Sequence, residues 1–197
     1  MPGSEIPDLQ GVFRFVSRLH TMSKRGMRGA LADCPRCHFG MLENLHILIE
    51  QRGVEVRVQT AIAMNQIAEP YIRSKAIRHL EKGRVVIFGC GTGNPFFSTD
   101  TAAALRAAEI GADVIFKATN VDGVYDSDPK QNEKARKFAE VTYDEVIARQ
   151  LKVMDTAAVA LARENNIPIV VFAQTGESSL ADAVCGRGKF TIIKKEV

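Results

Sequence analysis

Two stretches of the sequence gather glycine, hydroxyl and charged residues of the kinds that bind nucleotides. The first reads Gly89-Cys90-Gly91-Thr92-Gly93-Asn94-Pro95-Phe96-Phe97-Ser98-Thr99-Asp100 and joins a predicted strand to a predicted helix. Its glycines let the backbone approach a ligand, and the start of a helix offers unpaired N–H groups to a phosphate. The second stretch runs from Lys117 to Pro129 and also follows a predicted strand. Because ligands bind outside the carboxyl ends of parallel strands, we expect the turns near Asn94 and Val124 to converge on one nucleotide site.

The second stretch holds groups that suit a nucleoside triphosphate. The Lys117 ammonium can neutralise a phosphate, and Thr119 or Asn120 can hydrogen-bond a base or a ribose. The ring of Tyr125 can stack on a base. Three aspartates can bind Mg²⁺ directly or through water, namely Asp122, Asp126 and Asp128. The alternative is a polar turn built on the usual Asp-Gly and Asp-Pro pairs.

Other motifs are less specific. Asp155, in Leu151-Lys152-Val153-Met154-Asp155, is either a plain helix cap or a carboxylate that organises phosphoryl transfer. The segment Cys34-Pro35-Arg36-Cys37-His38 matches a haem-attachment pattern and half of a zinc site, but no further ligand pair follows it. We interpret these cysteines as incidental and predict no metal held by the protein itself. The Rossmann pattern fails because Phe96 stands where its third glycine belongs.

Composition places the chain among ordinary globular proteins. It has 197 residues, of which 46% are hydrophobic and 25% charged, which excludes disordered, collagen-like and coiled-coil classes. The net charge of +3 is too small to imply a nucleic-acid partner, and no apolar run is long enough to span a membrane. A basic stretch covers residues 11–30 without an opening signal-peptide pattern, so we expect a reducing, intracellular compartment.

The elements that must position these groups alternate along the chain. Strands are predicted over 54–58, 84–88, 113–118, 167–172 and 190–193. Helices are predicted over 41–51, from Pro70 to Gly83, over 98–110, from Tyr143 onward, from Asp155 to Asn165 or Asn166, and over 179–184. Such alternation predicts an α/β fold with a largely parallel sheet covered by helices, in one domain spanning residues 1–197.

These motifs resemble those of the bacterial-type uridylate kinases, which belong to the amino-acid kinase family. The resemblance rests on 91–100, 117–129 and 151–155, with further support from 57–60, 68–73 and 79–88. It covers a core of about 53–189 and leaves 1–52 diverged or incomplete. It implies an N-terminally truncated, three-layer α/β/α sandwich in a homohexamer. It also implies transfer of the γ-phosphoryl group of Mg·ATP to UMP in the cytoplasm, with an organelle such as a plastid as the alternative location, and no nucleic-acid or membrane partner.

The resemblance implies roles for particular residues. The UMP pocket would be lined by Thr92, Gly93, Asn94, Pro95, Phe96, Phe97, Ser98 and Thr99, together with Arg14 and Asp33. ATP would be held by Thr119, Asn120, Tyr125 and Asp128, with Mg²⁺ as its counter-ion. The reaction itself would use Asp100, Asp128, Asp155 and Lys117.

The sequence departs from the family near its start. The family opens with a Lys-x-Ser-Gly-Glu phosphate loop and a Gly-Gly-Gly-Asn loop, and neither occurs here. Removing one cationic donor from a phosphoryl-transfer site typically costs ~10²–10³ in rate, so we expect this chain alone to be a poor or inactive kinase. The alternative function is that of an inactive nucleotide-binding homologue which regulates or assembles with complete subunits. An acidic amino-acid substrate is disfavoured by the pocket wall at 96–99.

Overall fold

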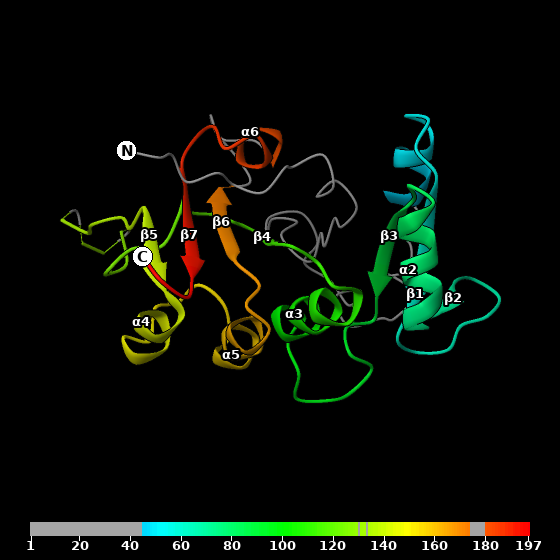
Figure 1. The fold of residues 1–197 in the computed structure, drawn as a ribbon, viewed down its shortest axis with the longest axis horizontal. Helices are drawn as coiled ribbons and strands as arrows, with labels where there is room; N and C mark the ends of the chain where they lie inside the picture. The colour runs from blue at the N-terminus through cyan, green and yellow to red at the C-terminus, as the bar shows by residue number, and fades with distance from the viewer. Residues whose placement is uncertain (1–44, 130, 133, 174–179) are drawn as a thin grey trace, which may run out of the picture. The chain divides into compact units, whose positions relative to one another are not determined.

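The computed structural model describes residues 45–129, 131–132, 134–173 and 180–197. These residues fall into two compact units, 45–97 and 98–197, which are described separately (Figure 1). Predictions made for Arg14, Asp33 and the Cys34–His38 segment lie outside the described residues. The single-domain organisation stays a prediction.

The unit formed by residues 45–97 is built on a three-stranded parallel sheet. Its strands are β1 (Val56–Thr60), β2 (Glu69–Pro70) and β3 (Val85–Gly89), in the order β2-β1-β3. Both neighbours run parallel to β1, and α2 (Arg73–Glu81) connects β2 to β3. The strand predicted over 84–88 is observed as β3, an apolar strand that is largely buried, as is typical of a strand covered on both faces.

The start of α2 differs from the prediction. Pro70 was expected to open this helix, but it lies in the edge strand β2 and the helix begins at Arg73. The Tyr71 N–H donates a hydrogen bond of 2.9 Å to the Thr60 carbonyl, which keeps the backbone extended one residue beyond Pro70. Because proline lacks an N–H, it is tolerated on an edge strand, where one side of the backbone has no partner strand.

The unit formed by residues 98–197 contains a four-stranded sheet. Its strands are β4 (Ile115–Thr119), β5 (Glu140–Thr142), β6 (Ile169–Ala173) and β7 (Phe190–Lys194), in the order β4-β6-β7-β5. The β4–β6 and β5–β7 pairs are parallel, whereas β6 and β7 are antiparallel. The predicted α/β class with largely parallel pairing is therefore confirmed, although the described strands pair in two sheets and the short β5 was not predicted.

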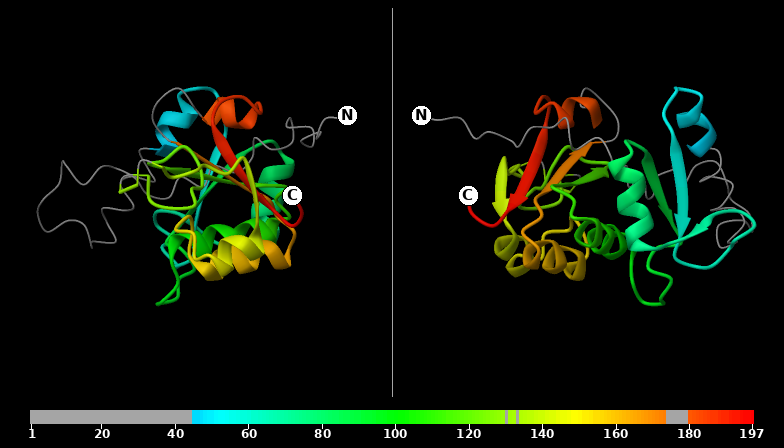
Figure 2. Two further views of the ribbon diagram at one scale, coloured as in Figure 1. Left: turned by 90° about the vertical axis from the view of Figure 1, so that its left-hand side faces the viewer. Right: turned by 45° about the vertical axis from the view of Figure 1, so that its right-hand side comes forward.

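Helices cover both faces of this second sheet (Figures 1 and 2). On one face lie α3 (Thr99–Ile110), α4 (Tyr143–Ala148) and α5 (Thr156–Glu164), and α6 (Leu180–Val184) lies on the other. In the described ranges, no helix is long and apolar enough to cross a membrane.

Side-chain caps and a left-handed glycine mark the ends of these helices. The Ser98 hydroxyl accepts the N–H groups of Asp100 and Thr101 at the start of α3, and Gly111 ends that helix in the left-handed conformation with φ of 67°. Thr142 caps α4 by accepting the Glu145 N–H. Each cap satisfies backbone donors that a helix end otherwise leaves unpaired.

Small residues bring α3 and α5 together. The facing core contains Ala104 and Ala107 from α3 and Ala158 and Ala162 from α5, all with no exposed surface. Alanine side chains let two helix backbones approach closely, which sets the first turns of the two helices side by side. This packing determines where Ser98 and Asp155 lie.

Tyr143 anchors α4 to the same core. Its ring is buried and its hydroxyl donates a hydrogen bond of 2.6 Å to the Ile167 carbonyl. Replacing Tyr143 by phenylalanine removes this donor while keeping the ring, so the free energy of unfolding should fall by about 1–2 kcal/mol. Urea denaturation of the variant measures the change, and an unaltered midpoint would contradict it.

Candidate active site

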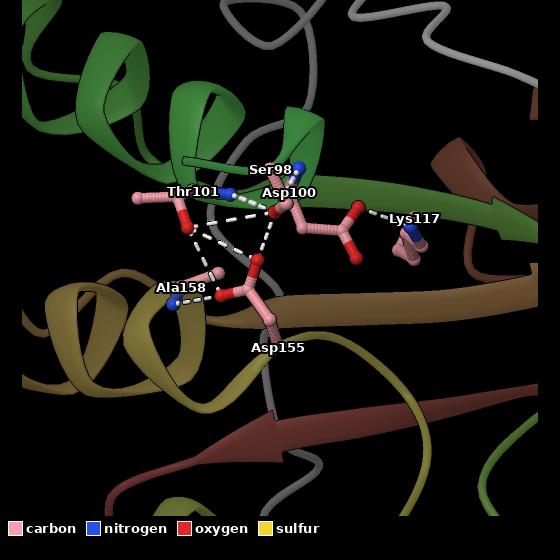
Figure 3. A network of polar contacts seen from close by, with 6 residues as sticks. All are labelled: Ser98, Asp100, Thr101, Lys117, Asp155 and Ala158. Atoms are coloured by element: carbon pink, nitrogen blue, oxygen red, sulfur yellow. Dashed lines mark hydrogen bonds and ion pairs between the residues drawn. The ribbon is translucent and has the colours of Figure 1, made fainter. Parts of the chain in front are cut away.

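Asp155 joins the first turns of α3 and α5 (Figure 3). One carboxylate oxygen accepts the Ala158 N–H at 2.7 Å, which caps α5. The other accepts the hydroxyl of Ser98, whose oxygen in turn caps α3. Thr101 donates its hydroxyl to the same carboxylate, with both oxygens at 3.0 Å. The cap prediction for Asp155 is therefore confirmed, and the carboxylate also links two helices.

The pKa of Asp155 is lowered by these contacts. Partial burial acts to raise it, but hydrogen bonds from Ser98, the Ala158 N–H and Thr101 together outweigh the burial. Donors that favour the charged form of a carboxyl group lower its pKa, since protonation would weaken each bond. Asp155 is consequently a carboxylate at neutral pH.

Lys117 and Asp100 form an ion pair in the same cluster (Figure 3). Lys117 extends from β4 and Asp100 lies in the first turn of α3. The two side chains are 23% and 25% exposed, so a ligand from solvent can reach both. Asp100 near a helix N-terminus is also favoured by the helix dipole.

The cluster of Ser98, Asp100, Thr101, Lys117 and Asp155 suits a phosphate group. The N-termini of two helices and an ammonium group supply positive potential, and the carboxylates fix their positions. Phosphoryl transfer depends on positioning and charge neutralisation more than on covalent chemistry, and these groups provide both. Every member of this cluster belongs to the unit 98–197.

A hairpin follows β4 and holds two of the predicted ATP residues, Tyr125 and Asp128. Its two legs pair through a bridge between Tyr125 and Lys137 and a hydrogen bond of 3.0 Å from the Asp126 N–H to the Arg136 carbonyl. At its base, the Tyr125 hydroxyl donates to Asp122 at 2.6 Å, and the Lys137 ammonium contacts the same carboxylate at 3.2 Å. We call the segment 124–138 the ATP hairpin, after the ligand that the sequence predicts for it.

The contacts of Asp122 alter two pKa values. Burial acts to raise the pKa of Asp122, but the Tyr125 hydroxyl and the Lys137 ammonium outweigh it and lower that pKa. The bond to Asp122 raises the pKa of Tyr125 to about 12, because ionising the phenol would break the bond and place two negative charges together.

Replacing Asp122 by asparagine should lower the pKa of Tyr125 from about 12 towards the ordinary value of 10. The substitution removes the negative charge that opposes ionisation of the phenol. Absorbance is titrated against pH for the folded parent chain and for the folded variant, and the difference between the two curves measures the shift in the pKa of Tyr125. Superimposable titration curves would contradict the Asp122–Tyr125 bond.

The turn at 89–97 belongs to the other compact unit. Gly93 has φ of 76°, and a side chain there would press against Ala61, with its Cβ 3.3 Å from the Ala61 carbonyl oxygen. The Thr92 hydroxyl accepts the Asn94 N–H at 3.1 Å, which shapes the turn. Phe96 and Phe97 are exposed, so both rings are available to a ligand. Convergence of this turn with the ATP hairpin stays a prediction.

The structure brings together four of the predicted site residues, Ser98, Asp100, Lys117 and Asp155. Tyr125 and Asp128 lie in the ATP hairpin instead, where the Asp128 carbonyl accepts the Asn132 N–H at 2.9 Å. The remaining predicted residues lie at the end of β4 or in the turn at 89–97, namely Thr119, Asn120, Thr92, Gly93, Asn94, Pro95, Phe96 and Phe97, with Thr99 opening α3.

Thr101 was not predicted as a site residue. Its position three residues after Ser98, in the first turn of a helix, was the available signal. The aspartates 122, 126 and 128 do not gather into a cation site: in the part of the chain that the structure describes, no three acidic, histidine or cysteine side chains are arranged to hold a metal ion. Asp126 instead accepts the Arg136 N–H at 2.9 Å.

Comparisons with known proteins identify related sequences and structures. The sequence model of the "Amino acid kinase family" matches residues 20–173. A curated uridylate kinase from Paramagnetospirillum magneticum is 52% identical over 191 residues, which cover 94% of this chain and 76% of that protein. The crystal structure of UMP kinase from Ureaplasma parvum has a TM-score of 0.78 and 35% identity, covering 81% of this chain and 68% of that one. The crystal structure of UMP kinase from Bacillus anthracis has a TM-score of 0.76 and 38% identity, covering 82% of this chain and 66% of that one.

Proposed function

The chain belongs to the amino-acid kinase family, and from this premise we propose that it is a nucleoside monophosphate kinase that phosphorylates UMP. An oxygen of the UMP phosphate attacks the γ-phosphorus of Mg·ATP. The bond from that phosphorus to the oxygen bridging it to the β-phosphate breaks, and the products are UDP and Mg·ADP. The relatives that are similar over most of the chain are uridylate kinases, which supports UMP as the acceptor.

The observation that carries this proposal is the cluster of Lys117 and the helix starts that Asp155 joins (Figure 3). A transferring phosphoryl group spreads negative charge over its oxygens, so preorganised positive groups stabilise the transition state. Lys117 supplies a full charge, and α3 and α5 supply partial charges from their N-termini.

We assign the residues as follows. Lys117 neutralises charge on the transferring phosphoryl group, and Asp100 orients Lys117. Asp155 holds the first turns of α3 and α5 together. The ATP hairpin, through Tyr125 and Asp128, binds Mg·ATP together with Thr119 and Asn120. The turn at 89–97 binds UMP, with the exposed Phe96 and Phe97 rings against the base. Mg²⁺ arrives with ATP as part of the substrate.

The experiment that tests this function measures ADP release in a coupled assay with UMP and Mg·ATP. Steady turnover that requires UMP, and that glutamate or aspartate cannot replace, supports the proposal. Calorimetry with UMP and with ATP identifies the alternative, because binding of both nucleotides without turnover would indicate an inactive nucleotide-binding homologue.

Residues 1–44, where the sequence departs from the family's motifs, lie outside the described residues. No observation on the described part of the chain favours an inactive, regulatory protein, and the similarity to uridylate kinases favours the enzyme.

The assembly and location are further parts of this proposal. The family resemblance supports a homohexamer in the cytoplasm, with a plastid as the alternative location. Apolar side chains exposed in the unit 45–97, such as Ile47, Leu48 and Ile67, suit burial in an assembly. Light scattering after size-exclusion chromatography tests the hexamer, and a monomer mass would contradict it.

A further inference from the structure

One buried hydroxyl fastens the ATP hairpin to the sheet. Thr191 lies on β7, has no exposed surface, and plays no part in the cluster around Asp155. Its hydroxyl oxygen accepts the Val124 N–H at 2.9 Å and donates its own hydrogen to the Phe138 carbonyl at 2.6 Å. Thr191 therefore contacts both legs of the hairpin at its base.

These contacts replace a backbone hydrogen bond. The Phe138 N–H donates to the Val124 carbonyl at 2.9 Å. In a hydrogen-bonded antiparallel pair, the Val124 N–H would normally donate directly to the Phe138 carbonyl. Here two hydrogen bonds take its place: the Val124 N–H donates to the Thr191 hydroxyl, and that hydroxyl donates to the Phe138 carbonyl. The hydroxyl thus completes the pairing that defines where the hairpin begins.

The two legs differ in how they are held. The returning leg leads from Phe138 into β5, and the Ile192 N–H donates to the Ala139 carbonyl at 3.0 Å just before that strand begins. The outgoing leg starts at Val124, whose N–H has the Thr191 hydroxyl as its acceptor. Val124 is 2% exposed, so water cannot readily replace a lost acceptor there.

The hairpin also fits closely against Thr191. A Cβ built on Gly123 would lie 2.5 Å from the Thr191 hydroxyl oxygen and 3.0 Å from the Lys137 side chain. Real atoms do not approach so closely, so residue 123 must be glycine for the hydroxyl to stay in place. Gly123 therefore leaves the space that the Thr191 hydroxyl needs to accept the Val124 N–H.

We propose that Thr191 is a positioning residue for Mg·ATP: its buried hydroxyl fixes the ATP hairpin and so holds Tyr125 and Asp128 where the nucleotide binds. This inference rests on the proposed function, since it takes the hairpin as part of the ATP site. Thr191 touches neither substrate, and its effect passes through Val124 and Phe138.

The test compares two substitutions of similar size. Thr191→Val keeps the shape of the side chain and loses the hydroxyl, whereas Thr191→Ser keeps the hydroxyl. We expect Thr191→Val to raise the KM for Mg·ATP about five- to tenfold, the usual effect of losing one buried hydrogen bond. The KM for UMP and the kcat at saturating ATP should stay within about twofold, and Thr191→Ser should restore the KM for ATP.

Amide hydrogen exchange provides a readout that does not need activity. In Thr191→Val, the peptide that covers Val124 should exchange about tenfold faster than in the parent chain, and Thr191→Ser should restore its protection. Gly123→Ala is the second variant: its new Cβ displaces the hydroxyl without altering Thr191, so it should reproduce both effects.

Tyr143→Phe is the matched control. It also removes one buried hydroxyl that donates to a backbone carbonyl, but its partner Ile167 lies outside the hairpin. We expect it to destabilise the chain while leaving the KM for ATP and the exchange at Val124 unchanged. If it raises the KM for ATP as Thr191→Val does, the effect is general destabilisation and the positioning role is overturned.

The remaining outcomes separate this inference from the proposed function. Faster exchange at Val124 with an unchanged KM for ATP would show that the hairpin does not serve ATP, which overturns the inference while UMP kinase activity stands. If the parent chain has no turnover, the proposed function fails, and calorimetry decides the inference. A Kd for Mg·ATP that rises about five- to tenfold in Thr191→Val supports it, and an equal Kd, or no binding by the parent chain, overturns it.

Discussion

Replacing Lys117 by methionine is expected to lower kcat for UDP formation about 10²- to 10³-fold. Methionine keeps the length of the side chain but removes the charge that would offset negative charge on the transferring phosphoryl group. The free energy of unfolding should change by about 1 kcal/mol or less, because the ion pair with Asp100 is partly exposed to solvent. Steady-state kinetics and urea denaturation on the same samples separate the two effects.

A matched lysine substitution provides the control. Lys195→Met makes the same change of charge at an exposed position after β7, and kcat should not respond to it. A double-mutant cycle with Asp100→Asn tests whether Lys117 and Asp100 act as a unit, in which case the double variant should be little slower than Lys117→Met alone. A kcat within threefold of the parent value in Lys117→Met would refute its assigned role.

Replacing Asp155 by asparagine should lower both turnover and stability. Asparagine can still cap α5 and accept the Thr101 hydroxyl through its oxygen, but its amide nitrogen cannot accept the hydroxyl of Ser98, so the link between the two helix starts is weakened. We expect kcat to fall about 10²-fold, since small displacements of positioning groups have effects of this size. We also expect the free energy of unfolding at pH 7 to fall by about 1–3 kcal/mol, the range for hydrogen bonds to a charged group.

The stability loss in Asp155→Asn should depend on pH. The pKa of Asp155 in the folded chain lies below the ordinary value of 3.8, because hydrogen bonds from Ser98, the Ala158 N–H and Thr101 together outweigh the opposing effect of burial. Its stabilising contribution is therefore complete above about pH 4 and is lost as the pH falls through the lowered pKa. Urea midpoints of the parent and the variant should converge below pH 4, and a gap that stays constant would argue against a charged Asp155.

Local signals in the sequence predicted much of the framework around the site. Ser98 and Gly111 bracket α3, and Asp155 begins α5, because capping depends on residues within one turn of a helix end. The apolar run that became β3 was also clear, since a strand buried on both faces needs little else to be recognised. The placement of Ser98 beside Asp155 was not readable in this way, because it depends on the alanine contacts between α3 and α5.

The errors and omissions have a common physical cause. Pro70 has two allowed uses, a helix start or an edge strand, and pairing with β1 decided for the strand. The three residues of β5 carry too little pattern to be identified, and β7 supplies their partners from 52 residues further on. In the sequence, Thr191 is an ordinary residue of a predicted strand. Its two hydrogen bonds form only because the fold brings Val124 and Phe138 against it. Contacts between distant segments are the information that a local pattern lacks.

The strand order β4-β6-β7-β5 has a consequence for protein synthesis. β5 borders β7 alone within this sheet, and β7 is the last of the described strands to leave the ribosome. Residues 140–142 must therefore wait, unpaired, until 190–194 emerge, and the loop carrying Tyr125 waits with them for its anchor. A nascent chain stalled before Phe190 would expose an unfinished sheet to chaperones and proteases, so translation must pass this point before any kinase activity can develop.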